Sequence, residues 1–241
     1  EIADTVESEL AHSNDLAGAS ILITAGPTLE DLDPVRFLGN RSSGRMGYAI
    51  ASMALRRGAE VTLVSGPVAL TAPVGADVVQ VRSARQMHEA VMKRFDSHDV
   101  VIMAAAVADY RPGVRAGQKI KKGGELKLEL VRNPDILADV GAKRSARPKV
   151  LVGFALETED LERSAREKLE RKGADLIVAN EANAGLGRDT NRASLVDQKG
   201  CTKLPEMPKR ALADQILDRI RALLSTHPRL PHAEAKSGPP N

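Results

Sequence analysis

The sequence has few aromatic residues, and this shortage limits what the protein can bind. Aromatic residues make up 2% of the 241 residues, and tryptophan is absent. Few side chains are therefore available to stack on bases, and the near balance of 35 basic and 32 acidic residues also argues against nucleic-acid binding. Hydrophobic residues still amount to 42%, so the core must be built from Ala, Val, Leu and Ile.

Cysteine and long apolar runs are scarce as well. The single cysteine, Cys201, cannot form an internal disulfide, which fits a reducing cytoplasm, where we expect the protein to act. Cys201 lies in a predicted hairpin turn with no histidine nearby in the sequence, so a catalytic thiol is not expected. No apolar run reaches the roughly 18 residues that span a membrane. The five histidines lack the spacing of zinc ligands, so we expect neither a membrane partner nor a zinc site.

Composition divides the chain into three parts. Residues 1–18 are acidic and polar and begin without Met, so we interpret them as a linker from a longer upstream chain. Residues 19–225 carry regular hydrophobic patterns and predict one domain. Residues 226–241 are rich in Pro, His and Ser and predict a disordered tail.

Short strands and amphipathic helices alternate along the predicted domain. Strands are expected at residues 20–24, 60–65, 77–82, 100–104, 150–154 and 175–179, and helices at 44–57, 84–95, 134–142, 159–172 and 208–224. This alternation predicts an α/β fold with a doubly wound, mostly parallel sheet, which binds ligands at the C-terminal ends of its strands. Residues 126–131 alternate with period two and predict an antiparallel or edge strand, which could be an arm that pairs with another subunit. Residues 193–196 and 202–204 predict a hairpin.

A loop rich in glycine and serine follows the first strand and a short acidic loop. The run Ser42-Ser43-Gly44 precedes a helix, and such a helix start favours an anion because its backbone N–H groups have no partner within the helix. The spacing of Gly39 and Gly44 is that of a P-loop, but the Lys-Ser/Thr pair is missing. The dinucleotide fingerprint is incomplete too. The alternative is that Ser42, Ser43 and Gly44 merely cap the helix.

Three further segments could carry chemistry. The alanines at residues 104–108 leave room for a ligand at a strand end, and Asp109 beyond them could hold a divalent cation or a ribose, or merely cap a turn. The basic run at 119–122 could neutralise phosphates or form a solvated face. Asn133 and Pro134 predict an N-cap and a first helical residue. Lys168 and Lys172 share one helix face, which solvation also explains.

Taken in order, these motifs resemble one enzyme family. The segments that carry the resemblance are residues 24–28, 33–37, 40–47, 105–110, 119–122 and 133–136, with further likeness at 153–155 and 179–180. Over residues 19–224 the sequence is similar to the bacterial phosphopantothenate–cysteine ligase, the C-terminal half of the bifunctional coenzyme A biosynthesis protein. Six motifs in the same order make the resemblance specific.

The resemblance implies a Rossmann-like fold, an extended β arm for dimerisation and a CTP-dependent reaction. CTP and 4′-phosphopantothenate would give an acyl-cytidylate and pyrophosphate, and L-cysteine would then displace CMP to form 4′-phosphopantothenoylcysteine. Mg²⁺ is expected as cofactor. The resemblance also implies a homodimer and an upstream flavin-dependent decarboxylase domain in the full-length protein, so no flavin is expected in this chain.

The resemblance also assigns roles to residues at matching positions. Asn40 and Lys119 are expected to be catalytic, Lys119 by neutralising charge as the cytidylate forms, and Asp109 is expected near magnesium. The residues expected to contact CTP are Asp109, Lys119, Asn133, Pro134, Asp135, Ile136, Phe154, Lys168 and Lys172. The residues expected on the phosphopantothenate side are Arg36, Asn40, Ser42, Ser43, Gly44, Ala105 and Ala106.

Two other functions are compatible with such a sheet. An NAD(P)-dependent short-chain reductase would need a Tyr-x-x-x-Lys motif, but Tyr48 is followed four residues later by Ser52, and Tyr110 by Val114. A non-catalytic nucleotide-binding domain is the other alternative. Nucleotide-dependent release of pyrophosphate would separate it from a ligase.

Overall fold

The fold is built around one twisted sheet, as the alternating pattern predicts. The computed structural model describes residues 14–226 apart from 122, 146–147, 158–159 and 182–188. Six strands of the sheet run parallel: β1 (Ser20–Ala25), β4 (Glu60–Ser65), β5 (Asp77–Gln80), β6 (Val100–Met103), β9 (Val150–Glu157) and β10 (Leu176–Glu181). Two antiparallel strands, β12 (Ala193–Asp197) and β13 (Gly200–Lys203), extend it beyond β10 and confirm the predicted hairpin.

The strand order is β5-β4-β1-β6-β9-β10, so the direction in which strands are added reverses between β1 and β6. This is the order of doubly wound dinucleotide-binding sheets, in which a crevice opens at the point of reversal. The predicted fold class is therefore confirmed, and its ligand-binding edge lies where β1 and β6 end.

Helices cover both faces of the sheet. The helices are α2 (Arg45–Arg56), α3 (Ala84–Met92), α4 (Ile136–Lys143), α5 (Leu161–Lys172), α7 (Lys209–Leu224) and the short 3-10 helix η1 (Phe95–Ser97). Apolar residues of α2 and α7 pack on the face that carries Ile21 and Ile23, and those of α3, α4 and α5 pack on the face that carries Leu22. Because both faces are buried, β1 is apolar along its length rather than alternating. Among the described residues, no helix is both long and apolar enough to cross a membrane.

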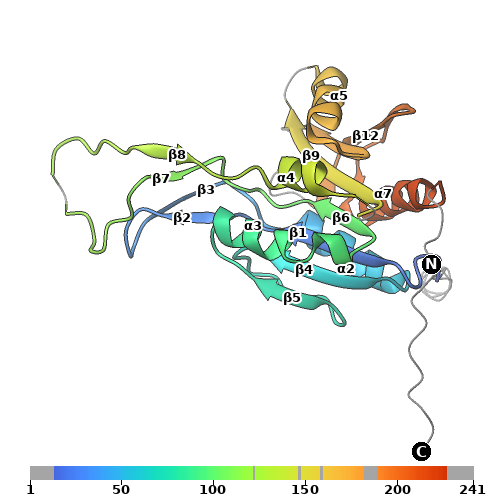
Figure 1. The fold of residues 1–241 in the computed structure, drawn as a ribbon, viewed down its shortest axis with the longest axis horizontal. Helices are drawn as coiled ribbons and strands as arrows, with labels where there is room; N and C mark the ends of the chain where they lie inside the picture. Colours follow the sequence, from blue (N-terminus) through green and yellow to red (C-terminus); the bar gives the residue numbers. More distant parts are fainter. Residues whose placement is uncertain (1–13, 122, 146–147, 158–159, 182–188, 227–241) are drawn as a thin grey trace, which may run out of the picture.

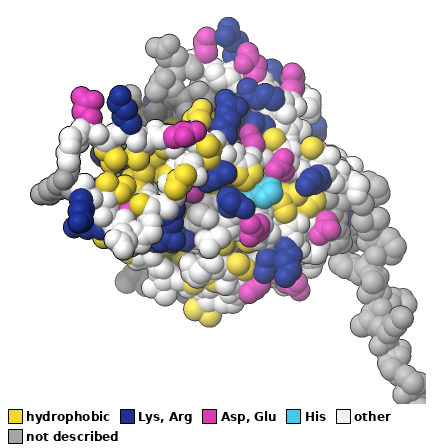
Figure 2. All heavy atoms as spheres, turned by 60° about the vertical axis from the view of Figure 1, so that its left-hand side comes forward, with side chains coloured by type: hydrophobic (Ala, Val, Ile, Leu, Met, Phe, Trp, Pro, Cys, Tyr) yellow, Lys and Arg dark blue, Asp and Glu magenta, His cyan; other side chains and the backbone are white. Residues whose placement is uncertain are grey.

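Two small hairpin-like sheets project from the edge of the molecule and form what we call the arm (Figure 1). They are β2 (Leu29–Asp31) with β3 (Phe37–Gly39), and β7 (Tyr110–Pro112) with β8 (Leu130–Arg132); the described residues between β7 and β8 belong to the arm as well. A further short pair joins β11 (Thr190–Asn191) to β14 (Met207–Pro208). The arm carries exposed apolar side chains, including Phe37, Val114, Leu126 and Leu130. Figure 2, turned so that the left-hand side of Figure 1 comes forward, shows hydrophobic side chains gathered on this side of the molecule.

Two local predictions need correction in the arm. The segment interpreted as an acidic loop after β1 contains the β2–β3 hairpin, whose three-residue strands are too short to show a period in the sequence. The strand predicted at residues 126–131 is present only as β8, which begins at Leu130, because β7 offers only three residues to pair with. Leu126 and Leu128 are exposed and lie outside the ladder.

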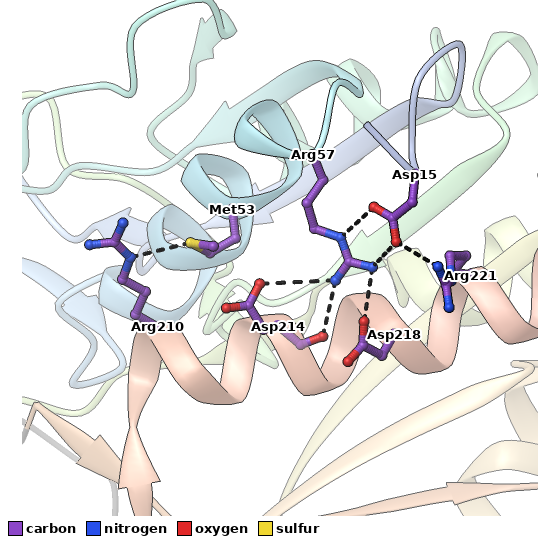
Figure 3. A network of polar contacts seen from close by, with 7 residues as sticks. All are labelled: Asp15, Met53, Arg57, Arg210, Asp214, Asp218 and Arg221. Carbon is purple, nitrogen blue, oxygen red and sulfur yellow. Dashed lines mark hydrogen bonds and ion pairs between the residues drawn. The ribbon is translucent and has the colours of Figure 1, made fainter. Parts of the chain in front are cut away.

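The N-terminal segment of the described chain is part of the packed domain, although the sequence places residues 14–18 in a linker. Leu16 is 2% exposed and joins the core. Beside it, Asp15 accepts two hydrogen bonds from the guanidinium of Arg57, at 2.9 and 2.7 Å. Arg57 also pairs with Asp218 and Asp214 of α7 (Figure 3). The remainder of the predicted linker and nearly all of the predicted tail, residues 1–13 and 227–241, lie outside the described residues.

Candidate active site

The ends of β1 and β6 are joined by backbone hydrogen bonds at the point where the strand order reverses. The N–H of Ala106 donates to the carbonyl of Gly26 at 2.9 Å, and the N–H of Thr28 donates to the carbonyl of Ala106 at 3.4 Å. The buried hydroxyl of Thr28 accepts from the N–H of Ala108 at 2.9 Å. These bonds fix the alanine-rich segment after β6 beside the glycine turn after β1, so the backbone of both loops is available at one edge of the sheet.

Helix α2 begins against the same turn and is not capped by a side chain. Its N-cap residue is Gly44, with φ of 74°, and neither Ser42 nor Ser43 bonds to the first turn of the helix. A Cβ on Gly44 would lie 2.7 Å from a methyl group of Val68, so both the positive φ and the close packing require glycine. The alternative that this run caps the helix holds for Gly44, which is the N-cap, but not for the serine side chains. The first N–H groups of α2 therefore remain available for an anion.

A cavity of about 550 Å³ opens at the ends of β6 and β9, between the start of α4 and the last turns of α5. Ser42, Ser43 and Gly44 do not line it. Eight of the nine residues expected to contact CTP line it together: Asp109, Asn133, Pro134, Asp135, Ile136, Phe154, Lys168 and Lys172. Ala105, expected on the phosphopantothenate side, lines it as well. The structure thus brings residues from four separate segments of the chain around one space.

Basic side chains outnumber acidic ones around this cavity. Arg132, Lys168, Arg171 and Lys172 face two carboxylates, Asp109 and Asp135. Such an excess of positive charge suits a polyphosphate, for which lysine acts as a point charge and arginine as a fork of donors. The ammonium of Lys168 donates to the carbonyl of Phe154 at 2.8 Å, which fixes it at the end of β9.

Asp135 caps the helix that opens onto the cavity. Its side chain accepts from the N–H of Ala138 at 3.1 Å, and its second oxygen accepts from the ammonium of Lys172. Burial opposes ionisation of Asp135, but the hydrogen bonds from Lys172 and Ala138 outweigh it and lower the pKa of the carboxyl below its ordinary value. Asp135 therefore remains a carboxylate, and it holds the ammonium of Lys172 beside the start of α4.

The prediction that Asn133 is the N-cap and Pro134 the first helical residue is wrong, because the helix begins at Ile136. A residue before proline favours extended backbone, which keeps Asn133 out of the helix. The side chain of Asn133 instead joins neighbouring segments: its amide nitrogen donates to the carbonyl of Ala108 at 2.8 Å, and its amide oxygen accepts from Arg111 at 3.1 Å. Asn133 thus anchors the start of α4 to the alanine-rich loop.

The remaining predicted residues divide into two groups. Asn40 does not line the cavity itself, but its amide donates to the carbonyl of Val107, a lining residue, at 3.0 Å. Ala106 lies in the joined loops next to Ala105. Arg36 and Lys119 lie on the arm, and neither lines the cavity within one chain.

Sequence reasoning missed several lining residues, including Tyr110, Arg132 and Arg171. Arg171 had a detectable signal, because it lies three residues after Lys168 on the same helix and so shares its face. Arg132 and Tyr110 directly adjoin Asn133 and Asp109, which were singled out. The apolar lining residues, such as Met103 and Leu137, look like ordinary core residues in the sequence and gave no signal.

The donor set at the cavity fits a magnesium ion held mostly by its ligand. The described residues contain no cluster of three or more His, Cys, Asp or Glu side chains that could hold a metal. Mg²⁺ usually binds one or two carboxylates together with substrate phosphates and water. Asp109 is exposed at the cavity and can supply one carboxylate, whereas Asp135 is engaged with Lys172.

A larger cavity of about 730 Å³ lies elsewhere, between the start of α5 and the β12–β13 hairpin. It contains Cys201 and several basic residues but none of the predicted site residues. Burial and the nearby charge of Glu162 raise the pKa of the Cys201 thiol, which keeps it protonated and unreactive. Size alone therefore does not mark the site, and the smaller cavity at the strand ends is the candidate.

Comparison with known proteins identifies the family. Residues 16–224 match the family described as the DNA/pantothenate metabolism flavoprotein C-terminal domain. The chain belongs to this family. This confirms the family that the motifs indicated, since the bifunctional coenzyme A biosynthesis protein CoaBC of Vibrio cholerae is 50% identical over 211 residues, covering 85% of this chain and 53% of that protein.

Two solved structures share the fold. The crystal structure of the C-terminal domain of CoaBC is 44% identical, with a TM-score of 0.78 over 89% of this chain and 100% of that domain. A mutant of Cab2, solved in complex with phosphopantothenate–cysteine, is 17% identical with a TM-score of 0.71 and shows the same fold. The chain spans about half the length of the curated relatives it matches.

Proposed function

We propose that this domain is a phosphopantothenate–cysteine ligase that uses CTP and acts in coenzyme A biosynthesis. The observation that carries the proposal is the cavity at the ends of β6 and β9, where an excess of basic side chains meets the start of α4 beside an alanine-rich loop. The family membership supports the reaction class, and the relatives are named as coenzyme A biosynthesis proteins.

In the first step, the carboxylate of 4′-phosphopantothenate attacks the α-phosphate of CTP, giving the acyl-cytidylate and releasing pyrophosphate. The substrate supplies its own nucleophile, so no catalytic serine or cysteine is needed, in agreement with the protonated state of Cys201. The domain contributes position and charge. Lys168 and Lys172 hold the polyphosphate, and the uncapped start of α2 holds the phosphate of phosphopantothenate.

In the second step, the amine of L-cysteine attacks the activated carbonyl and CMP leaves. Asn40 is placed for this step, because one N–H of its amide donates to Val107 and the other remains for the carbonyl oxygen that becomes negative. Asp109 would hold a Mg²⁺ ion, which would supply positive charge beside the nucleotide. Loss of one such preorganised donor typically lowers a rate by about 10²–10³-fold.

The reductase alternative lacks its catalytic base in this structure. Tyr48 is 6% exposed, and its hydroxyl forms a hydrogen bond with the buried hydroxyl of Ser65 at 3.0 Å. Tyr110 lines the cavity but has Val114 rather than lysine four residues later. Neither tyrosine therefore has the Tyr-x-x-x-Lys arrangement that a short-chain reductase needs.

The arm is proposed to pair with a second copy of the chain. Its exposed apolar side chains, with Phe37 at 50% and Val114 at 85% exposure, form a surface that a monomer would leave in water. Pairing would also bring Lys119 of one copy toward the cavity of the other, since Lys119 does not line the cavity of its own chain. Light scattering after size-exclusion chromatography checks this, with a dimer mass expected and a monomer mass contradicting it.

The deciding experiment measures pyrophosphate release with each of the four nucleoside triphosphates, with and without phosphopantothenate and cysteine. We expect release with CTP and phosphopantothenate, and formation of phosphopantothenoylcysteine and CMP when cysteine is added. The purified chain is expected to show no flavin absorbance and no decarboxylase activity. Hydride transfer from NADPH, or nucleotide binding without any pyrophosphate release, would overturn the assignment.

A further inference from the structure

One buried carboxylate on the arm has no part in the proposed chemistry, yet it is fully enclosed. Asp33 follows β2 and is 1% exposed. One of its oxygens accepts from the backbone N–H groups of Val35 and Arg36, at 2.7 and 2.8 Å. These two hydrogen bonds stabilise the turn between β2 and β3, as is common for an aspartate that bonds to the backbone N–H groups two and three residues later.

The second oxygen of Asp33 leaves the hairpin and reaches the segment between β7 and β8. It accepts from the N–H of Ile120 at 3.1 Å, 87 residues away in the sequence. The guanidinium of Arg36 donates to the carbonyl of the same residue at 3.1 Å. Asp33 and Arg36, which themselves lie 3.8 Å apart, therefore bind both backbone groups of Ile120.

Ile120 directly follows Lys119, so this clamp fixes the backbone from which Lys119 extends. The side chain of Lys119 is exposed, and a lysine on an exposed segment loses considerable conformational freedom when it must reach one point. A second backbone bond, from the N–H of Ala116 to the carbonyl of Leu32 at 2.9 Å, holds the segment a few residues earlier. Rigid placement of the segment is what a lysine needs to meet a reacting phosphate at a defined point.

We propose that Asp33 is a positioning residue for the ligase reaction: its carboxylate joins the β2–β3 turn to the backbone of Ile120 and so holds Lys119 in the geometry in which it acts. This inference rests on the proposed function, because it concerns the step that Lys119 assists. The ionised state of Asp33 supports it. Burial opposes the charge, but the N–H groups of Val35, Ile120 and Arg36 hold its pKa below the ordinary value.

The variant Asp33→Asn tests the bond to Ile120 while leaving the bonds within the β2–β3 turn in place. An asparagine oxygen can still accept the N–H groups of Val35 and Arg36, but its NH₂ group then faces the N–H of Ile120 and the guanidinium of Arg36, so donors meet donors. The matched control is Asp31→Asn, which removes a carboxylate from the same hairpin whose partners are the side chains of Arg82 and Arg115. Ile120→Pro removes the same hydrogen bond from the donor side.

The first readout is independent of the reaction. Limited trypsin digestion followed by mass spectrometry measures cleavage after Lys119 and Lys121, which flank Ile120 in the clamped segment. Cleavage after Arg115 is not used, because Arg115 pairs with Asp31, the control residue. We expect Asp33→Asn to be cut after Lys119 and Lys121 at least about tenfold faster than wild type, the effect of losing one hydrogen bond to a charged group, and Asp31→Asn to be cut less than about twofold faster. Equal cleavage of Asp33→Asn and wild type, with both folded by circular dichroism, would overturn the clamp.

The second readout tests whether the clamp acts through Lys119. At saturating CTP, Asp33→Asn and Ile120→Pro are each expected to slow pyrophosphate release about tenfold or more, and Asp31→Asn less than twofold. In a Lys119→Gln background, Asp33→Asn is expected to change the remaining rate less than about twofold, because residues that act as one unit are not additive. A full additional loss in that background shows a general structural role and overturns the proposal.

The two readouts also separate this inference from the proposed function. If no triphosphate gives pyrophosphate with the wild-type chain, the proposed function fails while the digestion still decides whether Asp33 clamps the segment. If the wild type is active but Lys119→Gln is equally active, Lys119 has no role and the positioning proposal is overturned, whereas the ligase assignment stands.

Discussion

Replacing Arg57 with methionine is the change for which the structure gives the clearest magnitude. The side chain of Arg57 is 7% exposed and makes two hydrogen bonds to Asp15, a carboxylate that is 14% exposed, and one ion pair of 2.9 Å to Asp218 (Figure 3). Methionine preserves the apolar part of the side chain but removes the guanidinium that donates two hydrogen bonds to the Asp15 carboxylate. Removing one partner of a buried pair typically costs about 3–5 kcal/mol.

The lower end of that range is expected here. Asp214 and Asp218 are 40% and 55% exposed, so water can solvate their carboxylates once the guanidinium of Arg57 is gone. Asp15 still pairs with the guanidinium of Arg221 at 2.9 Å. We therefore expect Arg57→Met to lower the free energy of unfolding by about 3 kcal/mol. For a domain of this size that corresponds to a fall in Tm of roughly 6–12 °C.

Thermal unfolding followed by circular dichroism, together with urea titration, measures this change. The matched control is Arg163→Met on α5, where the pair with Glu167 is exposed on both sides, at 77% and 65%, and is worth less than about 0.5 kcal/mol. A shift for Arg57→Met no larger than the control would refute the reasoning. The double variant with Asp15→Asn gives a second check: it should be less than additive, because the cost arises from an uncompensated buried charge.

Three predictions concern the site. Lys119→Gln should reduce acyl-cytidylate formation about 10²–10³-fold with the fold intact, and an unchanged rate of pyrophosphate release would exclude its role. Asn40→Asp should still form the acyl-cytidylate, detected by mass spectrometry, but convert it slowly, because a carboxylate replaces the donor; equal loss of both half-reactions, or of neither, would count against this. Lys172→Met should raise the CTP concentration for half-maximal release about tenfold. The free energy of unfolding of Lys172→Met should also be lower than that of wild type by about 1 kcal/mol at pH 7. Since Lys172 lowers the pKa of Asp135, this difference in stability should vanish as the pH falls below 3.8 and Asp135 becomes protonated. A stability difference that persists at that pH would show another cause.

Much of the fold follows from local patterns in the sequence. The apolar runs and helical periods predict all six parallel strands and five α-helices to within a few residues, because burial on both faces of a sheet leaves a continuous apolar signal. The motifs likewise identify the family, and the residues that the resemblance assigns to CTP are mostly found around one cavity. These features depend on neighbours that are near in the chain.

Capping at α4 shows where local rules become ambiguous. Asn133 and Asp135 are both good N-cap residues, and proline between them favours the earlier start. The helix is capped by Asp135 rather than Asn133 because the side chain of Asn133 donates a hydrogen bond to the carbonyl of Ala108 in another loop, and because Lys172 of α5 binds Asp135. Both partners come from distant segments, so no local preference could decide between the two residues.

The sequence by itself determined the class of fold, the family and most of the residue types that surround the site. Only the tertiary structure decided which of these residues meet: Lys168 and Lys172 at the cavity, Lys119 on the arm, and Asp33 against Ile120 across 87 residues. The physical reason is that periodicity records whether a side chain is buried, whereas a hydrogen bond or ion pair depends on which distant backbone or charge the chain brings within about 3 Å.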